Sequence, residues 1–174
     1  MNITLNKIKE HGQFYHAGRW ETLLKSKGKT EADDVEFPLA NVLESNGLDD
    51  ALWCLRCIPE HNAKWRLLAV SFAREVQHLM KDERSIKALD VAELYANGKA
   101  TYGELTVAKL DARDAVYDTA AWVAVWAAYK DAAWASLHAA RNAYKAAEAN
   151  ATWAEADAAR AKQEKLFRAA LEAA

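Results

Sequence analysis

The chain has 174 residues, of which 52% are hydrophobic and 28% charged, with two cysteines. This length suits one domain with a self-sufficient core, and the composition excludes both a disulfide scaffold and a disordered chain. The formal net charge of -2 gives no overall field that would attract nucleic acid or an anionic membrane, so neither is an expected partner.

Residues 1–35 are expected to form an N-terminal extension with two weak helices separated by glycines. Residues 1–10 interrupt every apolar pair with a polar residue, so they lack the apolar stretch of a secretory signal. The longest uncharged apolar run covers residues 120–129, ten positions, whereas a membrane span takes about 20. We therefore expect a cytoplasmic protein with no membrane segment, in which Cys54 and Cys57 are unpaired thiols.

Residues 36–100 are expected to form a core of short helices. Proline and Asn-Gly pairs punctuate this region, and apolar side chains recur at helical spacing most clearly over residues 62–80. That segment is expected to be the central core helix. The expected helices are 38–44, 48–58, 62–80 and one that Asp82 or Ser85 caps and that runs through residue 95.

Residues 104–174 contain no glycine or proline, and 27 of these 71 residues are alanine. Alanine has the highest helix propensity, so the whole stretch is expected to be helical. One uninterrupted rod would be about 105 Å long at 1.5 Å per residue, so we expect a fold-back. Thr152 and Glu155 have the spacing of a capping box and place the turn just before them, and Thr101 with Glu104 marks the start.

Large rings alternate with small side chains along the first arm of this hairpin. The stripe consists of Trp122, Trp126, Tyr129, Ala133, Leu137, Ala140 and Tyr144. Its regular spacing predicts a buried helix–helix seam, with Trp65, Trp122 and Trp126 in the core. The predicted fold is therefore all-α: a short-helix bundle packed on a long Ala-rich antiparallel helical hairpin formed by residues 101–174.

Cys54 and Cys57 form a C-x-x-C motif, which can hold a metal or act as a redox pair. The chain has no second such motif. His61 could supply a third metal ligand, and a fourth, such as His78, would have to come from elsewhere in the chain. Two small buried side chains within a helix are the favoured interpretation. Phosphate-binding loops and hydrolase motifs are also absent from the sequence, so we predict no catalytic residue, no metal and no cofactor.

Charge is unevenly distributed near the N-terminus. Residues 31–50 contain seven acidic residues and no lysine or arginine, whereas residues 1–30 carry six basic residues against two acidic ones. The acids either complement helix starts in a solvated segment or form a face that docks on a basic partner. Two tryptophans off the main stripe are further candidates for a covered surface. The candidate partner-binding residues are Asp33, Asp34, Glu36, Glu44, Asp49, Asp50, Trp134 and Trp153.

Residues 48–57, 65–78 and 84–93 resemble proteins carried by phages and prophages. The order of a short helix at 84–93, a Gly-containing turn at 97–98 and a long Ala-rich tail from 104 is similar to the helical immunity-protein family of bacterial toxin systems. This resemblance implies a small cytoplasmic all-helical protein that neutralises or modulates a partner by binding it.

The leading functional hypothesis is a non-enzymatic protein-binding module, encoded by a phage or prophage. It would neutralise a toxin or a host defence or regulatory protein by steric occlusion. One alternative is a homo-oligomeric structural or scaffold protein, in which the tryptophan–alanine seam is the subunit interface. Another is a thiol or metal-dependent enzyme that uses Cys54 and Cys57.

Overall fold

The fold is all-α, as predicted, apart from one small antiparallel ladder. The computed structural model describes residues 1–12, 18–115, 119–150 and 152–172. The ladder pairs β1 (Asn2–Ile3) with β2 (Phe37–Pro38). The α-helices are α1 (Leu5–Glu10), α2 (Arg19–Ser26), α3 (Ala40–Asn46), α4 (Leu48–Trp53), α5 (Asn62–Glu75), α6 (Glu83–Ala96), α7 (Tyr102–Asp114), α8 (Thr119–Ala127), α9 (Ala132–Asn150) and α10 (Trp153–Glu172).

The N-terminal segment packs onto the rest of the protein. Ile3, Leu5 and Ile8 are buried and belong to the same hydrophobic core as α5 and α9. The ladder explains why α3 starts two residues later than expected. Pro38 lies in β2, and the backbone N–H of Leu39 donates to the carbonyl of Met1 at 3.0 Å.

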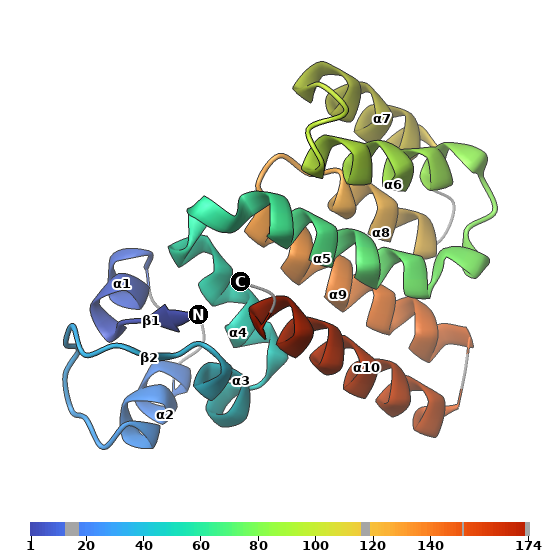
Figure 1. The fold of residues 1–174 in the computed structure, drawn as a ribbon. Coiled ribbons are helices and arrows are strands. Elements are labelled where there is room, and N and C mark those ends of the chain that lie inside the picture. The colour runs from blue at the N-terminus through green and yellow to red at the C-terminus, as the bar shows by residue number, and fades with distance from the viewer. Residues whose placement is uncertain (13–17, 116–118, 151, 173–174) are drawn as a thin grey trace.

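The central helix is α5, as its periodicity predicts. The side chains of Trp65, Leu68 and Phe72 on this helix are buried. The helix packs along α9 and also contacts α6 and α8 (Figure 1). It ends at Glu75, earlier than predicted, and a short 3₁₀-helix covers Gln77–Leu79. A second 3₁₀-helix, Cys54–Cys57, follows α4 where a continuous helix was expected.

The Ala-rich segment folds back more often than predicted. The expected turn before Thr152 is present between α9 and α10. The first arm, expected as one helix, is divided into three: α7, α8 and α9 (Figure 1). Both predicted capping boxes are formed. Thr101 and Glu104 exchange hydrogen bonds at the start of α7, and Thr152 and Glu155 do so at the start of α10.

A buried arginine explains the break between α8 and α9. Arg66 is 3% exposed, and its guanidinium donates to the carbonyls of Ala127 at 3.0 Å, Tyr129 at 2.7 Å and Lys130 at 2.9 Å. The Ala127 carbonyl lies at the end of α8, where helices leave acceptors without partners, and the carbonyls of Tyr129 and Lys130 lie in the connection that follows. The next helix starts because the Asp131 carboxylate accepts the backbone N–H of Trp134 at 2.9 Å.

This break divides the predicted aromatic stripe. Ala133, Leu137 and Ala140 are buried and face the core, in agreement with the expected seam. Trp122, however, is 40% exposed, so its assignment to the core is wrong, and Tyr129 is exposed outside any helix. A non-helical connection at residues 128–131 changes the helical phase, so the residues before it do not continue the buried face. Among the described residues, no helix is both long and apolar enough to cross a membrane.

Candidate functional site

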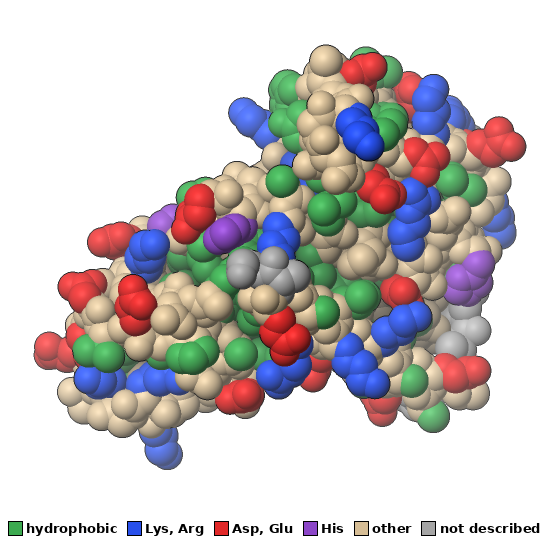
Figure 2. Space-filling view, viewed as in Figure 1, with side chains coloured by type: hydrophobic (Ala, Val, Ile, Leu, Met, Phe, Trp, Pro, Cys, Tyr) green, Lys and Arg blue, Asp and Glu red, His purple; other side chains and the backbone are tan. Residues whose placement is uncertain are grey.

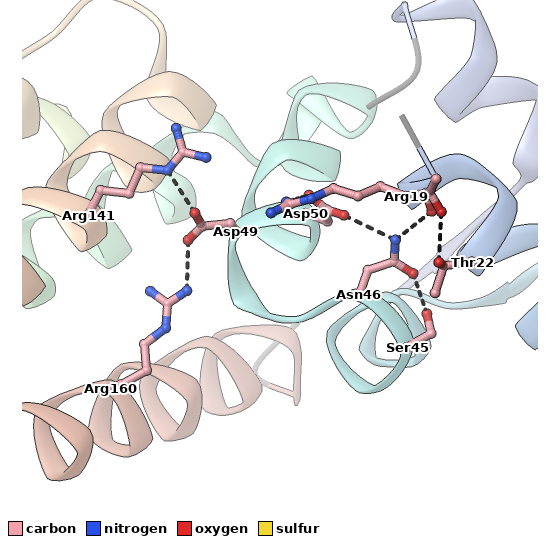
Figure 3. Close-up of polar contacts among 9 residues, drawn as sticks. Arg19, Thr22, Ser45, Asn46, Asp49, Asp50, Arg141 and Arg160 are labelled. Atoms are coloured by element: carbon pink, nitrogen blue, oxygen red, sulfur yellow. Dashed lines mark hydrogen bonds and ion pairs between the residues drawn. The ribbon is translucent and has the colours of Figure 1, made fainter. Parts of the chain in front are cut away.

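Asp50 does not lie on the surface, although it is one of the predicted partner-binding acids. Its side chain is buried, at 4% exposure, because α4 turns it inward. The carboxylate pairs with Arg19 and accepts a hydrogen bond from Asn46 Nδ2 at 3.0 Å (Figure 3). The same amide nitrogen donates to the backbone carbonyl of Arg19 at 2.8 Å. Asp50 thus fastens α2 to α3 and α4 and is not accessible to a partner.

Asp49 is held between two arginines from the distant hairpin. Its carboxylate accepts from Arg141 Nε on α9 at 2.8 Å and from Arg160 Nη2 on α10 at 2.7 Å (Figure 3). Burial acts to raise the pKa of Asp49, but the hydrogen bonds and positive charges of the two arginines outweigh it, and the pKa is lowered. One carboxylate therefore joins α4, α9 and α10.

The remaining acids make separate contacts and do not form one continuous face. Asp33 pairs with Lys29 at 2.6 Å, and Glu36 accepts from Asn2 at 3.2 Å. Glu44 lies 3.6 Å from Arg168 of α10. Asp34 is exposed in the loop before β2. The structure thus places Asp34, Glu36 and Glu44 on the surface, and only Asp49 and Asp50 turn inward to arginines.

Trp134 is partly buried within a stack of planar groups. Its ring lies 4.9 Å from the His138 ring, and the Arg56 guanidinium lies 4.5 Å from its centroid. His138 also stacks on Trp126 at 4.1 Å, and burial and the neighbouring arginine charges lower the pKa of His138. Trp134 therefore presents little free ring to a partner. The side chain of Trp153, the other predicted aromatic contact, lies outside the described residues.

Cys54 and Cys57 are both buried and unpaired. Burial raises the pKa of Cys57 to about 12 and that of Cys54 well above its usual value. Thiols of this kind are protonated at neutral pH and are poor nucleophiles and poor metal ligands. Within the part of the chain that the structure describes, histidine, cysteine and carboxylate side chains form no cluster of three that could hold a metal.

An apolar groove lies between α6 and α7, at residues that the sequence did not single out. It has a volume of about 470 Å³. Its walls include Val91 and Leu94 from α6 and Val107 from α7, and Val107 is 58% exposed. Lys87 and Lys99 border the groove on the α6 side and in the connecting loop, and Glu104 and Asp111 border it on α7.

Exposed apolar side chains occur both in this groove and elsewhere on α7. Tyr102 and Leu110 on α7 and Leu94 on α6 are among the large hydrophobic residues that remain exposed. Figure 2 shows hydrophobic side chains gathered on the part of the molecule formed by α6 and α7. A sequence signal existed, because Val107 and Leu110 lie off the buried face defined by Leu105, Ala108 and Ala112.

A second, polar cleft of about 590 Å³ opens beside Asp49. It lies where α9 and α10 meet α4 and the start of α2. The residues that line it are Arg19, Asp49, Arg141, Tyr144, Lys145, Glu148 and Arg160. The acidic segment identified from the sequence therefore supplies one anion to a cleft whose other charged groups are mainly cationic.

No protein-family model, no curated protein and no solved structure matches the chain.

Proposed function

We propose that this chain is a non-enzymatic protein-binding module that contacts its partner through the groove between α6 and α7. The observation that carries the proposal is the apolar wall of that groove, in which Leu94 and Val107 remain exposed. Grouped exposed apolar side chains bordered by polar residues are typical of surfaces that another protein covers.

The charges around the groove favour a partner segment with a particular pattern. Lys87 lies on the α6 side, and Glu104 and Asp111 lie on the α7 side. An amphipathic helix with apolar residues facing the groove would fit if it carried acids toward α6 and bases toward α7. Binding would block the partner's own surface, so the mechanism is steric occlusion.

The resemblance noted for residues 48–57 and 65–78 supports one class of partner. We propose that the partner is a toxin or a host defence or regulatory protein, and that the gene belongs to a phage or prophage. The acidic residues that remain exposed, Asp34, Glu36 and Glu44, would contribute a secondary electrostatic contact to a basic partner.

Two matched substitutions test the groove. Val107→Asp places a charge in the groove, whereas Val35→Asp places the same charge at a valine of equal exposure, 59%, in the loop before β2. Both tagged variants and the unchanged protein are used to capture partners from a host lysate, and circular dichroism verifies their helix content. We expect one specific partner to be lost with Val107→Asp and retained with Val35→Asp. Equal capture by both variants would contradict the proposal.

The homo-oligomeric scaffold remains a second proposal, but not through the predicted tryptophan–alanine seam. The buried part of the tryptophan–alanine stripe, Ala133, Leu137 and Ala140, already packs inside one chain and is not free for a second subunit. A scaffold would therefore have to use the α6–α7 groove. Light scattering across a hundredfold range of concentration distinguishes the two proposals, because a scaffold dissociates on dilution whereas a binding module stays monomeric.

A further inference from the structure

The polar cleft beside Asp49 has more positive than negative charge. Arg19, Arg141, Lys145 and Arg160 line it, against the carboxylates of Asp49 and Glu148. Arg19 is additionally paired with Asp50 from the protein interior. When Asp50 is added to the anions, the four cations still exceed the three anions by one. Asp49 is shared by two of the arginines.

Several donors in the cleft have no partner among the residues that the structure describes. Arg141 uses only Nε for Asp49, so its two terminal nitrogens are not engaged by any described residue. The Nζ of Lys145 likewise has no ion pair or hydrogen bond among the described residues, and its side chain is exposed. Arg160 gives one terminal nitrogen to Asp49, while its other makes only a long 3.3 Å contact with Gln163.

The placement of these cations is unfavourable for the helix itself. Arg141 and Lys145 are four residues apart on α9, a spacing at which like charges repel. Arg160 faces them from α10, and the ring of Tyr144 lies 5.9 Å from its guanidinium. Asp49 fixes the two arginines in position, which preorganises donors that would otherwise be mobile. Such a fork of guanidinium groups matches the oxygen atoms of a phosphate.

We infer that this cleft binds the dianionic phosphate group of a small phosphorylated molecule. The terminal nitrogens of Arg141 and the Nζ of Lys145 donate to the phosphate oxygens, and Arg160 adds its charge from the facing helix. Tyr144 provides a flat surface beside the phosphate for the organic part of the ligand. This site is distinct from the α6–α7 groove and does not depend on the protein-binding proposal.

Isothermal titration calorimetry with inorganic phosphate and with adenosine monophosphate tests the inference. The buffer contains sodium chloride at matched ionic strength, because non-specific attraction is screened by salt. Lys145→Ala removes a donor in the cleft, and Lys165→Ala removes another exposed lysine, on α10 outside the cleft. Thermal unfolding should be unchanged by Lys165→Ala and unchanged or slightly raised by Lys145→Ala, since neither lysine has a partner among the described residues and Lys145 lies four residues from Arg141.

We expect saturable binding of both probes with one site per chain. Lys145→Ala should weaken binding by about five- to tenfold, the effect of losing one charged contact, and Lys165→Ala should change it by less than about twofold. Tighter binding of the nucleotide than of free phosphate would show that the organic part also contacts the cleft. Three results would overturn the inference: no saturable heat with either probe, equal weakening in the two variants, or nucleotide binding that free phosphate does not compete.

Discussion

Replacement of Arg66 by methionine tests the explanation given for the break between α8 and α9. Methionine keeps most of the side-chain volume but removes all three hydrogen bonds to the carbonyls of Ala127, Tyr129 and Lys130. Burial lowers the pKa of Arg66, yet arginine remains cationic at neutral pH. The substitution therefore removes a buried charge and leaves three acceptors without a donor.

The expected loss of stability follows from two opposing contributions. A hydrogen bond from a charged donor contributes about 1.5–3 kcal/mol net, so three such bonds would give about 4.5–9 kcal/mol. Removing the guanidinium also removes its desolvation cost, which is several kcal/mol for a buried ion. We therefore expect Arg66→Met to reduce the free energy of unfolding by about 3–5 kcal/mol.

Urea denaturation followed by circular dichroism measures this loss, and hydrogen exchange locates it. Amides of residues 128–135 should lose protection in Arg66→Met before those of α5 do. Arg74→Met is the matched control on the same helix, because Arg74 makes solvent-exposed ion pairs with Asp90 and Glu93. Arg74→Met should reduce the free energy of unfolding by less than about 1 kcal/mol. If both variants lose the same stability, Arg66 does not hold the turn.

Three further predictions concern Asp49, Gly47 and Cys57. Because the pKa of Asp49 is lowered in the folded protein, its ion pairs contribute to the free energy of unfolding at pH values above 3.8, the pKa of the unfolded state. This contribution is lost as the pH falls through the pKa of the folded state. Asp49→Asn should therefore lower the free energy of unfolding by about 1–3 kcal/mol at pH 7, and this difference should shrink in urea titrations below pH 4. Gly47→Ala should cost about 1–3 kcal/mol in thermal unfolding, because Gly47 adopts φ 86° and ψ 176°, which only glycine tolerates well. Cys57, with its pKa raised to about 12, should react with a thiol reagent at pH 8 only after denaturant is added.

Each of these predictions has a result that would contradict it. An Asp49→Asn variant that remains less stable by the same amount at pH 3 would show that the carboxylate charge is not the cause. Gly103→Ala serves as the control for Gly47, since Gly103 lies inside α7 and alanine should be neutral or stabilising there. A native protein whose Cys57 reacts within minutes at pH 8 would show that the thiol is less buried than described.

Local signals in the sequence predicted much of the fold correctly. The capping boxes at Thr101 and Thr152 and the cap at Asp82 depend on residues two or three positions apart, and all of them are formed. The start of α5 and its buried face were predicted correctly because its apolar period is regular, whereas its end lies five residues earlier than predicted. The start of α9 was not predicted although a local signal existed, since Asp131 is a good N-cap residue that lies directly before the helix.

The end of α8 and the arginine cluster were not predictable from local patterns. Arg66 ends α8 from more than 60 positions away, and an alanine-rich stretch gives no sign of such a partner. The acidic segment was identified correctly as unusual in charge, but the cations that neutralise Asp49 come from positions 92 and 111 residues later. The groove at Val107 depends on how two helices are placed side by side, which helical periodicity does not specify.

The distance along the chain between Asp49 and Arg160 has a consequence for biosynthesis. During translation, Asp49 emerges from the ribosome long before Arg160, which follows 111 residues later. Since domains begin to fold from the N-terminus during translation, the early helices must remain in an incomplete arrangement until the last helix emerges. A nascent or truncated product that ends before Arg160 would lack this clasp, and cellular proteases would encounter it as an open, degradable intermediate.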